Sequence, residues 1–151
     1  MLVKEAKQIA VSLSNTSKMP CKSYGLPAGS SCPVGSKLQR VPGSTCSDCY
    51  ACKWMYQFTN VKESQHKRLE SINHPLWIDA MVRLIGKDKY FRWHDSGDIQ
   101  SMDHLLKIFA VCNATPNTSH WIPTREKALI SRYMKSGGII PDNVVIRLSA
   151  A

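Results

Sequence analysis

Three cysteines stand at Cys46, Cys49 and Cys52, each three residues from the next, in the stretch "GSTCSDCYACKWMYQF". A more distant cysteine, Cys32, is followed by Pro33, so the full pattern is Cys-x13-Cys-x2-Cys-x2-Cys. Structural zinc sites commonly use two separated Cys-x-x-Cys pairs. Ferredoxin-type clusters use cysteines three residues apart, completed by a remote cysteine. The spacing therefore predicts a 4Fe-4S cluster bound by Cys32, Cys46, Cys49 and Cys52.

Other uses of these thiols stay open. Zinc is the alternative metal, and buried or redox-active thiols are the alternative without a metal. Cys52 lies one helical turn from Cys49 if a helix begins at Asp48, so it can reach a shared metal; Cys21 is the substitute fourth ligand. Cys112 falls on the apolar face of an expected helix, which predicts a core residue.

A second group of reactive side chains occupies "RWHDSGD" (residues 92–98) and "PTRE" (residues 123–126). A histidine, carboxylates and an arginine that converge could perform general acid–base chemistry, hold a phosphate, or donate hydrogen bonds around a metal site. The structural alternative is that Asp98 or Ser101 caps the next helix and His94 bonds a neighbouring backbone group. The candidate catalytic residues are His94, Asp95, Asp98, Arg125 and Glu126.

The elements around these motifs alternate between strand and helix. The sequence predicts strands at "KYFRW" and "SHWIPT", helices at "SMDHLLKIFAVCNATP" and "KALISRYMKSGG", and a buried strand at "NVVIRLSA". This order is typical of parallel strands joined by helical crossovers, an α/β fold. Functional groups in such sheets gather at the carboxyl ends of the strands, where both polar motifs fall. We therefore expect the two motifs to meet.

The first half of the chain is less regular. Residues 21–48 are rich in Gly, Pro, Ser and Cys and lack a periodic apolar pattern, so we expect an irregular loop organised by the metal. A helix is predicted from Asp48 to Ile72, and a second one over residues 75–86, with Pro at its start and Gly at its end. We predict a single domain over residues 1–151. Its parts are a metal-binding loop at 21–52 and an α/β body at 53–151.

Composition limits the setting of the protein. With 43% hydrophobic and 21% charged residues, the chain is typical of a globular domain, and no apolar run approaches the roughly 20 residues that span a bilayer. The N-terminus lacks the pattern of a signal peptide. We therefore expect a cytoplasmic protein without a membrane partner, in which structural disulfides are disfavoured. The net charge of +9 favours polyanionic partners, among which nucleic acid is the commonest.

Four motifs in this order resemble one known family. They are "NTSKMPCKSYGLPA", "SCPVGSKLQRVPGSTCSDCYACKWMYQFTNV", "RWHDSGDIQS" and "HWIPTRE". The chain resembles the bacteriophage "gene product 88" family over nearly its whole length. Members share the cysteines that match Cys32, Cys46 and Cys49, whereas the position of Cys52 is less regular. The resemblance implies a metal or cluster site in a viral protein of the host cytoplasm, and it does not supply a reaction.

Three classes of function follow from these observations. The first is a phage-encoded iron–sulfur protein with a redox, electron-transfer or cluster-dependent role, whose partner would be a host redox protein. The second is a cluster-dependent enzyme with an open iron site. The third is a nucleic-acid-binding module stabilised by zinc or a cluster. In each case we expect the cluster to lie beside the strand-end residues, so that cysteines and polar side chains form one site.

Overall fold

The computed structural model describes residues 1–15, 21–27, 32–33, 59–94 and 97–149. The described helices are α1 (Val3–Ala10), α3 (Thr59–Ser71), α4 (Trp77–Ile85), α5 (Met102–Ala114) and α6 (Lys127–Lys135). The described strands are β1 (Ser14–Asn15), β2 (Lys22–Tyr24), β3 (Tyr90–Trp93), β4 (Ser119–Thr124) and β5 (Val144–Leu148). The predicted α/β class is confirmed, and strands alternate with helices from β3 to β5.

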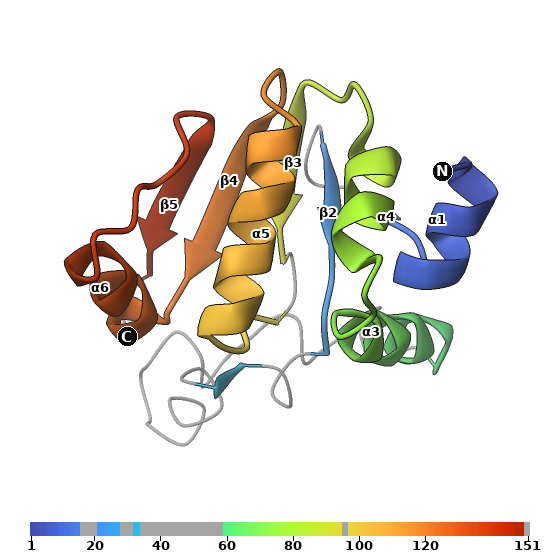
Figure 1. The fold of residues 1–151 in the computed structure, drawn as a ribbon. Coiled ribbons are helices and arrows are strands. Elements are labelled where there is room, and N and C mark those ends of the chain that lie inside the picture. The colour runs from blue at the N-terminus through green and yellow to red at the C-terminus, as the bar shows by residue number, and fades with distance from the viewer. Residues whose placement is uncertain (16–20, 28–31, 34–58, 95–96, 150–151) are drawn as a thin grey trace.

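The strands form one sheet in the order β1-β2-β3-β4-β5 (Figure 1). Strands β2 to β5 are parallel, and the two-residue strand β1 pairs antiparallel with β2. A row of register partners crosses the sheet, with one residue from each parallel strand. Ser23 pairs with Arg92, Arg92 with Trp121, and Trp121 with Val145. The strands β3, β4 and β5 end at one edge of the sheet, which we call the carboxyl edge.

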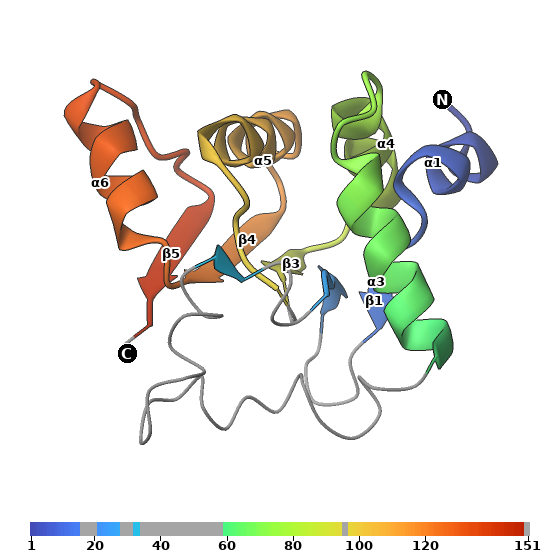
Figure 2. The same cartoon turned by 90° about the horizontal axis from the view of Figure 1, so that it is seen from below.

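All of the described helices lie on one face of this sheet (Figure 2). Crossovers between parallel strands are nearly always of the same hand. Here the strand order follows the chain order from β2 to β5, so successive crossovers advance in one direction and deliver their helices to the same side. The opposite face therefore receives no helix from the described part of the chain.

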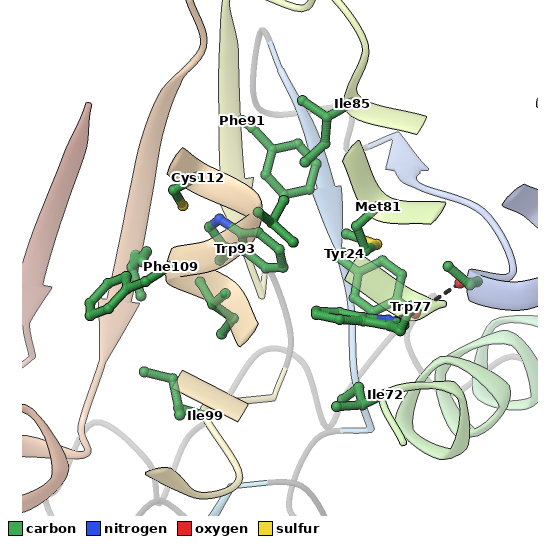
Figure 3. Packing of buried hydrophobic residues seen from close by; sticks show 14 of the residues in the cluster. Tyr24, Ile72, Trp77, Met81, Ile85, Phe91, Trp93, Ile99, Phe109 and Cys112 are labelled. Carbon is green, nitrogen blue, oxygen red and sulfur yellow. Dashed lines mark hydrogen bonds between the residues drawn. The ribbon is translucent and has the colours of Figure 1, made fainter. Parts of the chain in front are cut away.

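The core between helices and sheet is built around large aromatic side chains (Figure 3). Tyr24, Trp77 and Trp93 are fully buried, and the ring of Trp77 packs edge-on against Tyr24 at a centroid distance of 6.0 Å. Their polar atoms are satisfied within the core: the Tyr24 hydroxyl donates to the Ala10 carbonyl oxygen at 2.8 Å and accepts from the Trp77 indole N–H at 3.3 Å. Burial of these rings supplies most of the apolar surface that holds α1 and α4 to the sheet.

Helix α3 is attached by a buried arginine. The Arg68 side chain donates from Nε to the Ser12 carbonyl oxygen at 2.8 Å and from Nη1 to the Gly25 carbonyl oxygen at 3.2 Å. Its guanidinium also lies 5.7 Å from the centre of the Tyr24 ring. One side chain thus connects α3 to the chain after α1 and to the end of β2.

Most of the predicted element boundaries are confirmed. Helix α5 begins after Ser101, whose Oγ accepts from the His104 N–H at 3.2 Å, so Ser101 is its cap. Helix α4 ends at Gly86, where φ is +59°, a conformation that glycine adopts without a steric cost. The predicted helix from Asp48 is confirmed from Thr59 onward, and its first part lies outside the described residues.

Two expectations are wrong. The irregular loop predicted at 21–48 contains strand β2, which pairs with both β1 and β3 and buries Tyr24 completely. The segment predicted as a buried strand is β5, whose side chains are exposed or half-buried, because it lies at the edge of the sheet and is covered by helices on one face. The segment predicted to bind a metal and the α/β body therefore share one sheet.

None of the described helices is long and apolar enough to cross a membrane.

Candidate functional site

Asp98 joins the two polar motifs at the carboxyl edge. Its Oδ1 accepts from the Thr124 hydroxyl at 2.6 Å and from the Ile99 N–H at 2.8 Å, and its Oδ2 accepts from the Arg125 N–H at 3.0 Å. The turn after β3 and the turn after β4 are therefore connected through one carboxylate. The convergence predicted from the strand ends is confirmed for these residues.

The environment of Asp98 has opposing effects on its charge. Burial raises the pKa of the Asp98 carboxyl above its usual value, while the hydrogen bonds from Thr124, Arg125 and Ile99 and the positive charge of Arg125 act in the other direction. The carboxylate has all its described donors within the protein, which is typical of a structural connection. It is not placed as a free general base.

His94, by contrast, is buried, and its ring makes no hydrogen bond with the part of the chain that the structure describes. It follows β3 directly, its φ is +56°, and it is 3% exposed. Within the described ranges, this holds for Nδ1 and for Nε2. The ring lies 5.9 Å from the ring of Trp93 and 5.4 Å from that of His104, measured between centroids. The expected bond from His94 to a neighbouring backbone group is not formed with any described residue.

His104 of α5 faces His94, and sequence reasoning missed it. Its Nδ1 accepts the Gln100 N–H at 3.0 Å, so in the neutral ring the proton resides on Nε2, and this N–H donor has no partner. Burial, followed by the nearby charge of Lys107, lowers the pKa of His104 to about 4. Burial, followed by His104, lowers the pKa of His94 well below its usual value. The pair is consequently neutral at physiological pH, and both ring nitrogens of His94 and Nε2 of His104 have no hydrogen-bond partner among the described residues.

The glycine in the first motif, Gly97, lies in the turn that follows β3. Gly97 has a φ of +86°, so it supports the tight turn that brings Asp98 back towards β4. Gln100 then closes the turn, because its side-chain Nε2 donates to the Asp98 carbonyl oxygen at 2.6 Å. The turn is thus held by backbone geometry and by two side chains.

Of the other polar residues in the two motifs, some lie beside Asp98 and some do not. Glu126 is buried, and its backbone N–H donates to the Thr124 hydroxyl at 3.0 Å. Arg125 contributes its backbone N–H and its charge to Asp98. Arg92 does not belong to this group, because its guanidinium lies over the ring of Trp121, 4.9 Å from the centroid. Trp121 alternates along β4 with the buried His120 and Ile122, so both side chains lie on the sheet face opposite the described helices. Asp95 lies outside the described residues.

Only part of the cysteine pattern can be placed. Residues 32–33 lie beyond the carboxyl edge, near the start of α5, in both views of the fold (Figures 1 and 2). Cys46, Cys49 and Cys52 lie outside the described residues. Within the described ranges, no group of three or more His, Cys, Asp or Glu side chains could hold a metal ion.

The two other cysteines differ in environment. Cys21 directly precedes β2, at the opposite end of the strand from the carboxyl edge, and burial raises the pKa of its thiol while Arg92 acts to lower it. Cys112 is fully buried in the core, as predicted, and burial raises the pKa of its thiol to about 12. The Cys112 thiol therefore stays protonated and is unsuited to bind a metal.

Comparison with known proteins identifies a family. A model of the family described as "Gene product 88" matches residues 1–151, the whole chain. Comparison with curated proteins and with solved structures gives no match. The predicted resemblance is thus confirmed over the entire length, with the four motifs in their expected order. The chain belongs to the Gene product 88 family of phage proteins.

Proposed function

We propose that this phage protein binds an iron–sulfur cluster of the 4Fe-4S type and serves a redox or electron-transfer role. The observation that carries the proposal is the run Cys46, Cys49 and Cys52 with the remote Cys32. Three cysteines at this spacing can occupy three corners of a cubic cluster, and a remote cysteine can occupy the fourth. Such a cluster, when bound, exchanges single electrons.

The chemistry of the described residues fits this cofactor. Residues 32–33 lie beyond the carboxyl edge, and this edge also carries the buried imidazole of His94, whose nitrogens have no partner. Hydrogen-bond donors near the sulfurs of a cluster raise its reduction potential, and His94 is available as such a donor. Arg125 supplies positive charge at this edge, which would offset the charge of four thiolates. These features support a cluster site beside the carboxyl edge.

The test is elemental analysis of protein purified without oxygen. We expect about four iron and four acid-labile sulfide per chain, as a cubic cluster with four thiolate ligands requires. Zinc is measured in the same sample. One zinc per chain without sulfide would contradict the cluster and favour the alternative in which zinc is structural. Absence of both metals would favour free thiols.

Ligand variants locate the site. Cys32→Ser, Cys46→Ser and Cys49→Ser should each lose the bound iron, and Cys52→Ser reports whether Cys52 is the fourth ligand. Cys21→Ser tests the substitute ligand. The matched control is Cys112→Ala, since the Cys112 thiol is buried in the core and protonated, so this variant should keep its full iron content. Full iron in Cys46→Ser would show that the site is misassigned.

The same preparation distinguishes the roles of the cluster. A reversible redox couple without response to small molecules supports electron transfer, with a host redox protein in the cytoplasm as the partner. A spectral change on addition of a small-molecule cofactor would instead favour a cluster-dependent enzyme with an open iron site. Cys52→Ser is informative here, because an iron without a cysteine ligand is the expected feature of such an enzyme.

A further inference from the structure

We propose that the sheet face opposite the helices binds single-stranded nucleic acid. This surface, which we call the open face, consists of the outward side chains of β3, β4 and β5. Its members are Tyr90, Arg92, Trp121, Val145 and Arg147. The proposal stands apart from the cluster, because it uses none of the cysteines and none of the residues at the carboxyl edge.

The open face is a direct result of the topology. Side chains alternate along a strand, and in β4 the buried His120, Ile122 and Thr124 point towards the helices, so Trp121 and Pro123 point the other way. Since the described helices all cover one face, the outward side chains are left without a helix (Figure 2). Tyr90 is 51% exposed, Trp121 37% and Val145 65%. Ser23, at the β2 end of the same row, is fully buried, so the accessible part lies over β3, β4 and β5.

The exposed rings are organised together with cations. Arg92 and Trp121 are register partners, and the guanidinium carbon lies 4.9 Å from the centre of the indole ring. Val145 is the next partner in this row, and Lys89 places its ammonium 5.5 Å from the centre of the Tyr90 ring. Single exposed apolar residues are ordinary on protein surfaces. An arginine aligned with an exposed indole, beside a second exposed ring with its own cation, is more specific, because arginine and aromatic side chains both stack on nucleobases.

The charge of the open face selects a polyanion. The outward positions of β3, β4 and β5 include Arg92 and Arg147 and no acidic residue. At the amino end of β3, Asp88 forms an ion pair with Lys22 at 3.5 Å, so this carboxylate is already balanced. The whole chain carries a net charge of +9. Arginines beside exposed rings are the combination that binds the phosphates and bases of unpaired strands.

The exposed rings of the open face define which nucleic acid fits. A stacking surface needs bases that are free to turn outward, and bases paired within a duplex are not. Stacking and phosphate contacts do not read the sugar, so DNA and RNA single strands should bind alike. Recognition of sequence is not expected, since each base presents a ring face to the indole.

The test uses the full chain purified without oxygen, with fluorescently labelled single-stranded oligonucleotides of about 15 nucleotides. Binding is followed by anisotropy over a series of salt concentrations, with a duplex of the same length as the comparison. Trp121→Ala should weaken binding by roughly 5- to 100-fold through loss of a base stack. Arg147→Gln should weaken binding and reduce the slope of log affinity against log salt by about 0.7, the value for one phosphate contact on a single strand.

Matched controls separate the open face from general charge. Arg132→Gln removes the same charge from the exposed surface of α6, on the helical side, and should leave affinity within about twofold. Val145→Glu places a carboxylate at an exposed position beside Trp121, at the β5 end of the row, so it should abolish binding without unfolding the protein. This variant also replaces Trp121→Ala if the latter fails to fold.

Several results would overturn the proposal. Equal losses in Arg147→Gln and Arg132→Gln would mean that only net charge matters. Equal affinity for duplex and single strand would exclude base stacking. Absence of oligonucleotide binding at low salt, together with dimers that Val145→Glu dissociates, would assign the open face to a second copy of the chain.

Discussion

His120 shows how a single buried residue connects strand and helix in this protein. Its Nδ1 accepts the Trp93 indole N–H at 3.1 Å, and its Nε2 lies 2.8 Å from the Thr115 hydroxyl, which in turn donates to the Val111 carbonyl oxygen at 2.9 Å. The bond from Trp93 requires that Nδ1 carry no proton, so Nε2 is the donor to Thr115. Burial lowers the pKa of His120 to about 4, which keeps the ring in this neutral form.

We expect His120→Leu to lower the free energy of unfolding by about 1–3 kcal/mol, because the Trp93 indole N–H would be buried without an acceptor. His120→Asn offers a side-chain oxygen in place of Nδ1 and should recover part of this loss. The measurement is urea denaturation, and the control is His66→Leu on the exposed surface of α3, with an expected change within about 0.5 kcal/mol. A His120→Leu protein as stable as the parent would mean that the hydrogen-bonded chain contributes nothing.

At the scale of elements, the turns that follow β3 and β4 act as one unit. Asp98 receives donors from its own turn and from the turn after β4, so the start of α5 and the start of α6 are held in a common arrangement. The buried His94 and His104 lie within the same unit. Any ligand at the carboxyl edge would therefore meet a surface whose shape depends on Asp98.

We expect Asp98→Ala to lower the free energy of unfolding by about 3 kcal/mol, because the Thr124 hydroxyl and the Ile99 and Arg125 amides would lose a charged acceptor. Asp98→Asn keeps the oxygen that serves Thr124 and Ile99, so its effect should be smaller. Hydrogen exchange adds a local measurement: the amides of Ile99 and Arg125 should exchange faster in Asp98→Ala.

The control for Asp98 is Asp103→Ala on α5. Its carboxylate is largely exposed and forms an ion pair with Lys107 at 3.3 Å, which predicts a loss below about 1 kcal/mol. If both alanine variants were equally stable, the connection between the two turns would be energetically unimportant.

At the scale of the whole molecule, three buried histidines make stability depend on pH. His94, His104 and His120 all have a pKa below the ordinary value of 6.5, and burial is the main cause in each case. In the unfolded chain these rings take up protons as the pH falls through about 6.5. In the folded protein His104 and His120 stay neutral down to about pH 4, and the pKa of His94 is also well below its ordinary value. The unfolded state therefore binds more protons in this range, so acid favours unfolding.

We expect the free energy of unfolding to fall between about pH 6.5 and about pH 4, by about 1.4 kcal/mol per pH unit for each histidine. Asp98 partly opposes this trend. Its pKa is raised in the folded protein, so as the pH falls the folded state binds this proton before the unfolded state does and gains stability. Urea denaturation at a series of pH values measures the slope. His104→Gln should reduce the slope by the contribution of one histidine, about 1.4 kcal/mol per pH unit, and His66→Gln should leave the slope unchanged. An equal slope in His104→Gln and the parent protein would contradict this account.

The sequence by itself determined the features that depend on neighbouring residues. Apolar periodicity, the Ser101 cap and the glycine after Ile85 define α4, α5 and α6, because these signals act within one or two helical turns. The alternation of strands and helices then predicted parallel strands, and with them the meeting of Asp98 with Thr124 and Arg125.

Tertiary structure alone decided the features that depend on contacts between distant segments. Strand β2 is three residues long and shows no periodicity, and it is a strand because it pairs with β3, which lies more distant in the chain. The pairing of His94 with His104 follows from how α5 packs on the sheet, which no local pattern contains. The exposure of Arg92 on one face of the sheet could not be predicted from the sequence either, because an arginine fits either face of a strand. It depends on the tertiary structure, in which all described helices lie on the other face.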